Sequence, residues 1–356
     1  MFKYIVATVL LQLVCVIQGT PNYFENKSRP LVISHRGACG EMPDHSEASY
    51  TTAYFDGTDF NEPDLQVTKD GVLLISHNPC MKETTNIENF PQFESRRRDF
   101  SYTSNETSFS CQDDFLINDF TWDELMEAGL KVRNRYAHRS HLLDDVYPAM
   151  RLEDVIELML KLNEESPRTD NIFKTGLYIE TKGVGLYKEL GYNIAELFYD
   201  VLAKYDIETA EKAGKKLPIV IESFEQDSLL FFKNITDLPT VQLMFFNDRI
   251  KYDISWIVQY SDGVGPNNNY MFNYGGEERT AEEPSKFIEE CHALGLKVHP
   301  YVLQDDMLLH SDNAIKEHEI WYNKGVDGIF TEFPETTLQS FRYLTSKSRI
   351  IFKISE

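Results

Sequence analysis

Residues that could do chemistry are concentrated in the first eighty positions of the chain. His35 and Arg36 directly follow a short apolar run, Glu62 and Asp64 lie two apart in a second β-like run, and His77 ends a third. Carboxylates bind divalent cations, arginine binds phosphate oxygens, and histidine exchanges protons near neutral pH. Together these residues predict metal-assisted chemistry on a phosphate group.

The acidic residues have the spacing of a cation site. Glu62 and Asp64 are two apart on a predicted strand, so their side chains point to one face, and Glu180 ends another apolar strand. Three converging carboxylates repel one another unless a cation lies between them. Oxygen ligands suit Mg²⁺ or Ca²⁺ rather than zinc, so we expect one such ion. The alternative is that these acids are strand-end charges paired with lysine or arginine.

The two histidines have the positions of a general acid and a general base. His35 and His77 each close a predicted strand. Cleavage of a phosphodiester needs a base for the nucleophile and an acid for the leaving oxygen, and two histidines on opposite sides of phosphorus supply both. A single strand-end histidine is more often a hydrogen-bonded structural residue. The hypothesis therefore depends on the combination with the carboxylates, and it leaves open which histidine has which role.

Two cationic side chains have both a catalytic and a structural interpretation. Arg36 can bind a phosphate oxygen bidentately, or it can form an ion pair with Glu62 or Asp64. Lys182 lies two residues past Glu180 on the same strand face. Its ammonium can contact a phosphate oxygen, stabilise the carboxylates, or remain solvated.

Three aromatic residues are candidates for the wall of the site. Phe224, Tyr301 and Trp321 follow or accompany predicted elements in the second half of the chain. Phe224 and Tyr301 are expected to contact substrate. Core packing is the better interpretation of Trp321, because tryptophan buries a large apolar area.

Short β-like runs alternate with amphipathic helical runs through most of the chain. The expected strands are 31–34, 59–66, 72–76, 176–181, 217–223, 240–246, 263–265, 297–302 and 328–331. The expected helices are 46–55, 152–163, 187–205, 227–232, 284–294, 314–324 and 335–344. If 72–76 extends a hairpin, about eight βα units remain, which predicts a (β/α)₈ TIM barrel. A doubly wound open sheet is the alternative, which the lack of a Gly-x-Gly-x-x-Gly motif after the first strand disfavours.

Residues 80–149 interrupt this alternation after the second strand unit. A polar segment of this length is far longer than an ordinary loop. Its aromatic residues favour an ordered insertion that caps the catalytic face over a disordered one, because large aromatic side chains are usually buried. We therefore expect the insertion to influence leaving-group choice, with its acidic segment Gln112-Asp113-Asp114 favouring cationic head groups. Arg96–Arg98 could equally face solvent.

The N-terminus and the cysteines indicate export. Residues 1–19 have the apolar pattern of a signal peptide, with an uncleaved signal anchor as the alternative, and residues 20–356 would form the single barrel domain. No later segment has the length and apolarity of a membrane span. Four cysteines follow the signal segment, which allows two disulfides or buried free thiols: Cys39, Cys80, Cys111 and Cys291. Glycosylation sequons at Asn26, Asn105 and Asn234 agree with a secreted or lumenal protein.

The composition limits the classes of partner. Hydrophobic residues make up 42 % of the chain, which is enough for a large core and argues against disorder. The net charge of −22 disfavours nucleic acid and anionic membrane surfaces as partners. A phosphate-bearing small molecule would need a cation or a few basic side chains to overcome this background.

The motifs in this order resemble the glycerophosphodiester phosphodiesterase family. The matching segments are SHRGACG-x-x-PDHSEASY, DFNEPDLQVTKDGVLLISHN, YIETK, IESF, KVHPYV and VDGIFTEFP, from residue 31 to 337. The long insertion, with KETTNIENF and RYA, is similar to the larger secreted or periplasmic branch. The resemblance implies that the carboxylates hold one divalent cation, often Ca²⁺, and that the two histidines are the general acid and base. It also implies glycerol 3-phosphate and an alcohol, such as choline or ethanolamine, as products.

The chain departs from the family pattern at three places. Pro43-Asp44-His45-Ser46 stands where Pro-Glu-Asn-Thr is usual, Asn78 replaces the aspartate after the second histidine, and Thr331-Glu332 replaces Thr-Asp. None of these changes removes a candidate catalytic residue. Asn78 removes a charge beside His77, which would alter the pKa of that histidine.

These observations predict a secreted, metal-dependent glycerophosphodiester phosphodiesterase. Two alternatives share the same motifs. One is a lysophospholipase D that acts on lysophospholipids, which requires an apolar channel under the insertion. The other is a catalytically silent barrel that serves as a binding module, which the complete set of histidines and carboxylates disfavours.

Overall fold

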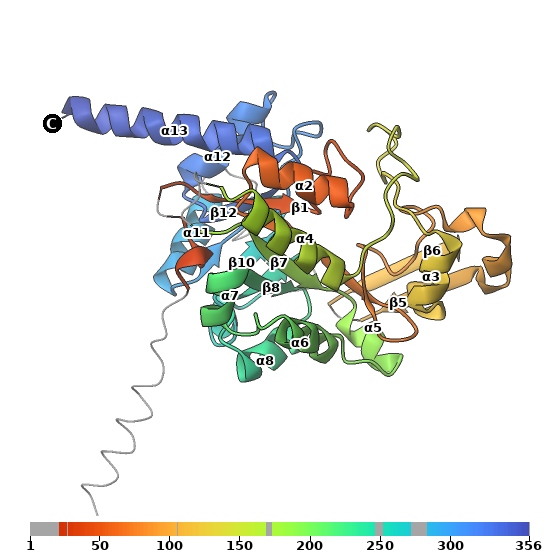
Figure 1. Cartoon of the computed structure of the whole chain (residues 1–356). Helices are drawn as coiled ribbons and strands as arrows, with labels where there is room; N and C mark the ends of the chain where they lie inside the picture. The colour runs from red at the N-terminus through yellow and green to blue at the C-terminus, as the bar shows by residue number, and fades with distance from the viewer. Residues whose placement is uncertain are drawn as a thin grey trace, which may run out of the picture.

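A ring of parallel strands forms the centre of the molecule, and helices surround it (Figure 1). The structure is a computed structural model that describes residues 21–26, 28–104, 106–168, 173–245, 252–271 and 283–355. The ring strands are β1 Leu31–His35, β2 Phe60–Glu62, β7 Gly176–Thr181, β8 Ile219–Ser223, β9 Thr240–Met244, β10 Gly263–Pro266, β11 Lys297–Val298 and β12 Gly328–Thr331. Their hydrogen-bonded order is β11-β10-β9-β8-β7-β2-β1-β12.

Backbone hydrogen bonds between the two ends of this order close the ring. The amides of Asp327 and Phe330 donate to the carbonyls of Val298 and Pro300, each at 3.0 Å. The amide of Leu303 donates to the carbonyl of Phe330 at 2.8 Å. The sheet therefore has no open edge here, so the predicted (β/α)₈ barrel is confirmed and the doubly wound open sheet is wrong.

An antiparallel hairpin extends the second strand unit. The predicted strand 59–66 is interrupted at Pro63, which has no amide hydrogen to donate, and it continues as β3 Asp64–Val67. β3 pairs in parallel with β7 and antiparallel with β4 Leu73–Ile75. The run 72–76 is thus part of a hairpin. This agrees with the prediction of about eight βα units, which counted 72–76 as the extension of a hairpin.

Aromatic side chains near the N-terminus close the lower end of the barrel. In the 3₁₀ turn η1 Asn22–Phe24, the hydroxyl of Tyr23 donates to the carbonyl of Ile219 at 3.3 Å. The ring of Phe24 lies 5.3 Å from that of His299 and is completely buried. Because Ile219 begins its strand, this plug lies at the amino ends of the strands. The carboxyl ends are left for the functional site, as in other barrels.

The helices cover the outside of the ring. They are α2 Glu47–Asp56, α4 Leu152–Glu165, α5 Val184–Glu189, α6 Ile194–Lys204, α7 Ala210–Lys216, α8 Gln226–Ile235, α9 Ile254–Ile257, α10 Asn268–Met271, α11 Glu283–Ala293, α12 Ala314–Lys324 and α13 Pro334–Ser355. The single helix expected over 187–205 is two helices, because Gly191 adopts a φ of 91° and Asn193 caps the next helix. The last helix continues to Ser355 rather than ending near residue 344.

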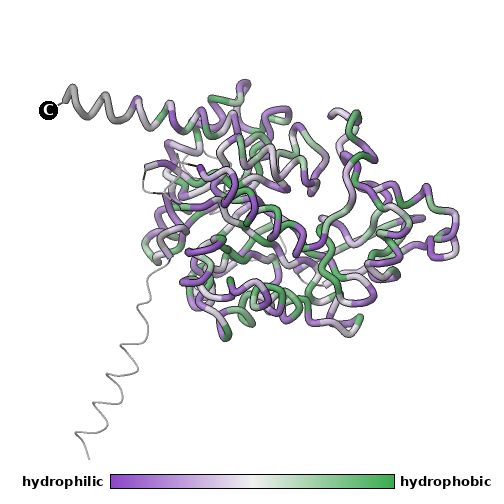
Figure 2. The backbone as a smooth tube through the Cα atoms, viewed as in Figure 1, coloured by the Kyte–Doolittle hydropathy of each residue, from purple (hydrophilic) through white to green (hydrophobic). Residues whose placement is uncertain are grey.

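The segment between β4 and α4 has an ordered structure of its own beside the barrel (Figure 1). It contains η2 Ile87–Asn89, η3 Pro91–Arg96, β5 Arg98–Thr103, β6 Ser108–Asp114, η4 Ile117–Asp119 and α3 Trp122–Ala128. Phe93, Phe115 and Phe120 form the aromatic part of its separate hydrophobic cluster. Hydrophilic residues are frequent along its outer edge (Figure 2). The aromatic residues therefore indicated order correctly, as their need for burial predicted.

The cysteines form one disulfide within the described residues. Cys80 is bonded to Cys111, which ties the start of the insertion to β6. Cys39 and Cys291 are buried free thiols, so the possibility of two disulfides is not realised. The predicted signal segment 1–19 and the sequon residue Asn105 lie outside the described residues. Within the described part of the chain, no helix is both long and apolar enough to cross a membrane.

Candidate active site

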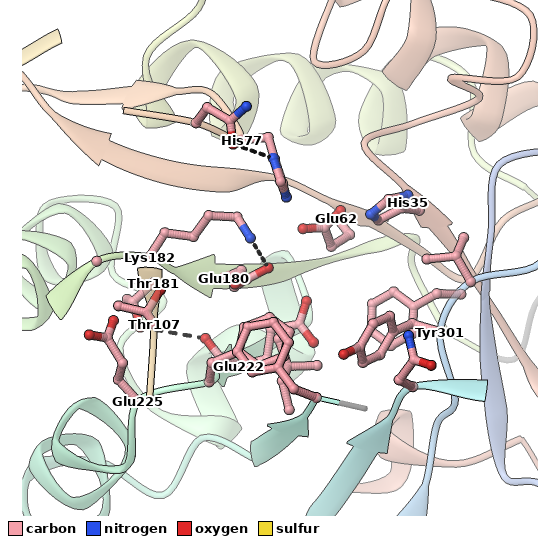
Figure 3. Close-up of a pocket in the computed structure, with 18 of the residues that line it drawn as sticks. His35, Glu62, His77, Thr107, Glu180, Thr181, Lys182, Glu222, Glu225 and Tyr301 are labelled. Atoms are coloured by element: carbon pink, nitrogen blue, oxygen red, sulfur yellow. Dashed lines mark hydrogen bonds and ion pairs between the residues drawn. The ribbon is translucent and has the colours of Figure 1, made fainter. Parts of the chain in front are cut away.

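Three buried carboxylates converge where neighbouring strands end. Glu62 ends β2, while Glu180 and Glu222 are register partners near the ends of β7 and β8. One oxygen from each lies within 4.8 Å of the others, and all three residues are at most 5 % exposed. Figure 3 shows these side chains in the centre of the cavity. Each also has one buried oxygen that accepts no hydrogen bond from the described residues: Glu62 Oε1, Glu180 Oε1 and Glu222 Oε2.

This cluster has the properties of a divalent-cation site. Burial, followed by the charge of Asp64, raises the pKa of Glu62 well above its usual range. Burial also raises the pKa of Glu180 to about 8, against the opposing effect of Lys182. A divalent cation would neutralise the charge and satisfy the unpaired oxygens. The all-oxygen donor set fits Ca²⁺ or Mg²⁺.

Glu222 is the member of this cluster that sequence reasoning missed. Its signal is the segment IVIES, an apolar strand that ends in an acid just as the neighbouring YIET segment does. In parallel strands, equivalent positions lie side by side, and the register pairs Glu180 with Glu222. The sequence therefore shows that Glu222 ends an apolar strand, but only the pairing of the strands shows that it lies beside Glu180.

Asp64 lies beside the cluster, and cationic groups surround it. Its Oδ1 is 3.1 Å from Lys182 Nζ, and its Oδ2 is 3.2 Å from Arg36 Nε. His45 Nε2 donates to Oδ2 at 2.9 Å. Burial opposes ionisation, but Lys182 and His45 lower the pKa of Asp64 well below its usual range. The predicted cation ligands were Glu62, Asp64 and Glu180. The structure brings Glu62 and Glu180 together, and it places Asp64 against Lys182 and Arg36.

Arg36 and Lys182 are both held in buried ion pairs and also line the cavity. Lys182 Nζ is 2.7 Å from Glu180 Oε2, and Arg36 Nη1 is 3.2 Å from Asp44 Oδ2. Arg36 has a φ of 59°, a left-handed backbone conformation that places its amide 2.9 Å from Glu62 Oε2. The ion-pair alternative therefore holds for Arg36, with Asp64 and Asp44 as its partners. Lys182 stabilises the carboxylates instead of being solvated.

Each predicted catalytic histidine is anchored through Nδ1. His35 Nδ1 lies 3.0 Å from Glu332 Oε1, and His77 Nδ1 lies 2.8 Å from Asn78 Oδ1. Both rings point toward the carboxylate cluster in Figure 3, and both residues line the cavity. Burial is the main cause that lowers the pKa of His35 to about 4 and that of His77 well below its usual value. Each neutral ring thus keeps Nε2 for proton exchange with a bound molecule.

The three departures from the family pattern all contact the site. Asp44 and His45 pair with Arg36 and Asp64, while Asn78 and Glu332 anchor the two histidines. The sequence analysis gave Asn78 only an effect on the pKa of its neighbour His77, and it gave Asp44, His45 and Glu332 no role. These three had no recognisable signal of their own, since their partners are not adjacent in the chain.

The cavity itself is about 370 Å³ in volume, a size suited to a small molecule. Phe224 stacks on Phe245 with ring centroids 3.8 Å apart, and Tyr301 meets Phe224 edge-on at 5.9 Å. The predicted wall residues Phe224 and Tyr301 therefore lie at the cavity. Trp321 is completely buried in the barrel core, as expected.

The insertion reaches the cavity through its hairpin. Thr107, Ser108 and Phe109, at and beside the start of β6, line the cavity. The acidic segment 112–114 has another environment: Asp113 forms ion pairs with Lys82 and Arg97. The acidic segment is not part of the cavity lining, so its predicted preference for cationic head groups would have to act from outside the lining and stays a prediction.

Arg96, Arg97 and Arg98 all form ion pairs, and of the three only Arg98 is exposed to solvent. Arg96 pairs with Glu124, and Arg98 pairs with Asp119. Arg97 pairs with Glu88 at 3.1 Å. The three arginines thus hold the insertion together.

Comparison with known proteins identifies the relationship. The model of the glycerophosphoryl diester phosphodiesterase family matches residues 35–336. Glycerophosphodiester phosphodiesterase GDPD6 of Arabidopsis thaliana is 28 % identical over 86 % of this chain and 84 % of its own length. The glycerophosphodiester phosphodiesterase of Haemophilus influenzae is 25 % identical over 88 % of this chain and 90 % of its own.

Solved structures show the same fold. A putative glycerophosphoryl diester phosphodiesterase from Silicibacter pomeroyi has a TM-score of 0.65 at 19 % identity, covering 90 % of this chain and 96 % of its own. An Oleispira antarctica phosphodiesterase in complex with the product sn-glycerol-3-phosphate has a TM-score of 0.56 at 17 % identity, covering 88 % and 96 %. Since the family model spans most of the chain, and carboxylates and histidines meet at the carboxyl ends of its barrel strands, this chain belongs to the glycerophosphoryl diester phosphodiesterase family of enzymes.

Proposed function

We propose that the chain hydrolyses glycerophosphodiesters to glycerol 3-phosphate and an alcohol, with one divalent cation. The observation that carries this is the meeting of three carboxylate oxygens without hydrogen bonds and two Nδ1-anchored histidines in one cavity. Family membership supports the reaction class. The product sn-glycerol-3-phosphate bound to the Oleispira antarctica protein supports the identity of the product.

The cation would be held by Glu62, Glu180 and Glu222. Asp64 Oδ1, which lies 3.1 Å from Lys182 Nζ, would be a further ligand. When bound, Ca²⁺ or Mg²⁺ supplies positive charge that neutralises the phosphate and the charge developing on it. Lys182 and Arg36 add cationic side chains at the edge of the cluster.

The histidines would move the protons. The Nε2 atom of one neutral ring takes a proton from the attacking group, either water or the 2-hydroxyl of the substrate. The other ring, which enters the step as an imidazolium protonated at both nitrogens, gives its Nε2 proton to the leaving oxygen. Glu332 behind His35 and Asn78 behind His77 orient the rings through Nδ1. The two anchors differ in charge, which makes the rings chemically unequal.

The aromatic wall favours a small leaving group with a cationic head, such as choline or ethanolamine. Phe224, Phe245 and Tyr301 present ring faces and edges to the cavity, and aromatic faces attract quaternary ammonium groups. Glu225 lines the same cavity and contributes negative charge. A lysophospholipid is the second candidate substrate, because Leu243 and Val302 make part of the lining apolar.

The central experiment assays purified protein on glycerophosphocholine, glycerophosphoethanolamine and lysophosphatidylcholine, with and without EDTA. Release of glycerol 3-phosphate that is lost with EDTA and restored by Ca²⁺ or Mg²⁺ would support the proposal. Turnover of lysophosphatidylcholine alone would support the lysophospholipase D activity. A protein that binds but turns over none of the three would be a silent barrel.

We also propose that the protein is secreted or resides in the lumen of the secretory pathway. The apolar residues 1–19, the disulfide between Cys80 and Cys111 and the exposed sequon at Asn234 support this.

The cation site yields the first prediction. Glu222→Gln and Asp64→Asn should each weaken Ca²⁺ binding at least about tenfold, since even residues that only support metal ligands change affinity on this scale. Isothermal titration calorimetry measures this, and the rise in Tm on adding Ca²⁺ should shrink in parallel. The exposed Glu189→Gln is the matched control and should bind as wild type. Unchanged binding by Glu222→Gln would remove Glu222 from the ligand set.

The proton-transfer roles yield the second prediction. His35→Ala and His77→Ala should each lower kcat by about 10²–10⁴-fold, the usual scale for general acid–base catalysis. The double variant should lose less than the product of the two effects, because residues that act together are non-additive. The exposed His141→Ala should keep wild-type kcat. A single variant with more than half of wild-type kcat would exclude that histidine from the mechanism.

The hairpin of the insertion yields the third prediction. Phe109→Ala should change the ratio of kcat/KM values between glycerophosphocholine and glycerophosphoethanolamine, because Phe109 lines the cavity and a ring edge or face distinguishes methylated from unmethylated ammonium groups. Phe100→Ala, on the neighbouring strand of the same hairpin, is the control. An unchanged ratio for both variants would show that the hairpin covers the cavity without contributing to discrimination.

The localisation yields the fourth prediction. Expression of the full chain in eukaryotic cells should release a protein that loses mass on N-glycosidase treatment. Mass spectrometry under non-reducing conditions should find a peptide pair joined through Cys80 and Cys111, with Cys39 and Cys291 alkylated as free thiols. A cytosolic protein with all these cysteines reduced would contradict the proposal.

A further inference from the structure

One loop of the insertion approaches both catalytic histidines. Arg135 Nη1 lies 3.4 Å from His77 Nδ1. Four residues later, Arg139 Nη2 lies 2.5 Å from Glu332 Oε2, and the other oxygen of Glu332 accepts from His35. The hairpin at the cavity is therefore not the only part of the insertion that reaches the site.

The contact through Glu332 is buried and ionic. Glu332 is completely buried, and it receives Gln304 Nε2 at 2.9 Å as well as the guanidinium of Arg139. Burial disfavours its charge, but the contacts of His35 and Arg139 hold the pKa of Glu332 far below its usual range. An ionised carboxylate only accepts hydrogen bonds, so it requires the proton of His35 to be on Nδ1. This assigns Nε2 of His35 as the atom that is free to accept a proton.

Arg139 is itself fixed on all sides. Nε and Nη2 bind Asp306 at 2.8 and 3.0 Å, and Nη1 donates to the carbonyl of Cys39 at 3.1 Å. Its guanidinium also lies 4.2 Å above the ring of Tyr136, and its side chain is 3 % exposed. One arginine thus joins the insertion to the loop after β1, the loop after β11 and the end of β12.

We propose that Arg139 is a positioning residue that acts on His35 through Glu332, so that the insertion completes the catalytic site. Without the guanidinium, Glu332 would remain as a buried charge with too little compensation, and it would take up a proton or turn away. His35 would then lose the acceptor that sets its tautomer and ring orientation. This inference rests on the proposed function, because it assumes that His35 reacts with the substrate.

A purely structural role makes a different prediction. If Arg139 only fastened the insertion to the barrel, its pair with Asp306 would matter as much as its contact with Glu332. Asp306→Asn weakens that pair and leaves Glu332 in place, so it separates the two roles. Arg133, in the same loop, is held bidentately by Asp145 at 2.6 and 2.7 Å, and Arg133→Ala is the matched arginine control.

The test compares kcat and KM on the glycerophosphodiester that wild type turns over. Arg139→Ala should lower kcat by about 10–100-fold, the scale seen when residues that support reacting groups are removed, and KM should change less than about threefold. Arg133→Ala and Asp306→Asn should keep kcat within about twofold. Guanidinium ion at low millimolar concentration, or the variant Arg139→Lys, should recover part of the lost kcat.

A double-variant cycle tests the path through Glu332. If Arg139 acts through this carboxylate, Arg139→Ala combined with Glu332→Gln should be no slower than the slower single variant. Losses that multiply, or an equal loss in Asp306→Asn, would overturn the proposal. If Arg139→Ala does not fold, Arg139→Lys and the Asp306→Asn control give the same comparison. An inactive wild type would instead contradict the proposed function, so the two failures are distinct.

Discussion

The mutual repulsion of buried carboxylates is the constraint on which the rest of this structure depends. Glu62, Glu180 and Glu222 have neighbouring positions at the carboxyl ends of adjacent strands, with Asp64 beside them. Holding so much negative charge out of water is unfavourable unless cations compensate it. Lys182 and Arg36 compensate part of it, and the unpaired oxygens leave room for a divalent ion. The positive charge of that ion would then be available to act on a phosphate.

The second feature of the site is that each reactive side chain has a partner behind it. His35 is backed by Glu332, His77 by Asn78 and Asp64 by His45. The two histidines line the cavity while Nδ1 of each ring is anchored, and fixing side chains in this way is how preorganised sites avoid reorganisation during a reaction. The supporting residues come from several loops. The barrel strands therefore place the site residues, and residues of the loops orient their side chains.

The insertion therefore has two separate connections to the chemistry. Its hairpin contributes part of the cavity wall, where discrimination between leaving groups would occur. Its loop with Arg135 and Arg139 contacts His77 directly and reaches His35 through Glu332. A disulfide and a separate hydrophobic cluster keep the insertion ordered, so both connections can be held in place.

The sequence by itself determined the barrel, because apolar strand runs alternate with amphipathic helices in a local pattern that parallel packing requires. It also predicted site residues where such runs end, and the structure brings four of them to one cavity: His35, His77, Glu62 and Glu180. It did not determine the partners: Arg139 and Glu332 are 193 residues apart, and Glu222 joins the cluster only through strand register. Local patterns specify which elements form and where their polar ends lie. Only the closed barrel decides which of those ends meet, because charge pairing across loops depends on distances in space that sequence spacing does not encode.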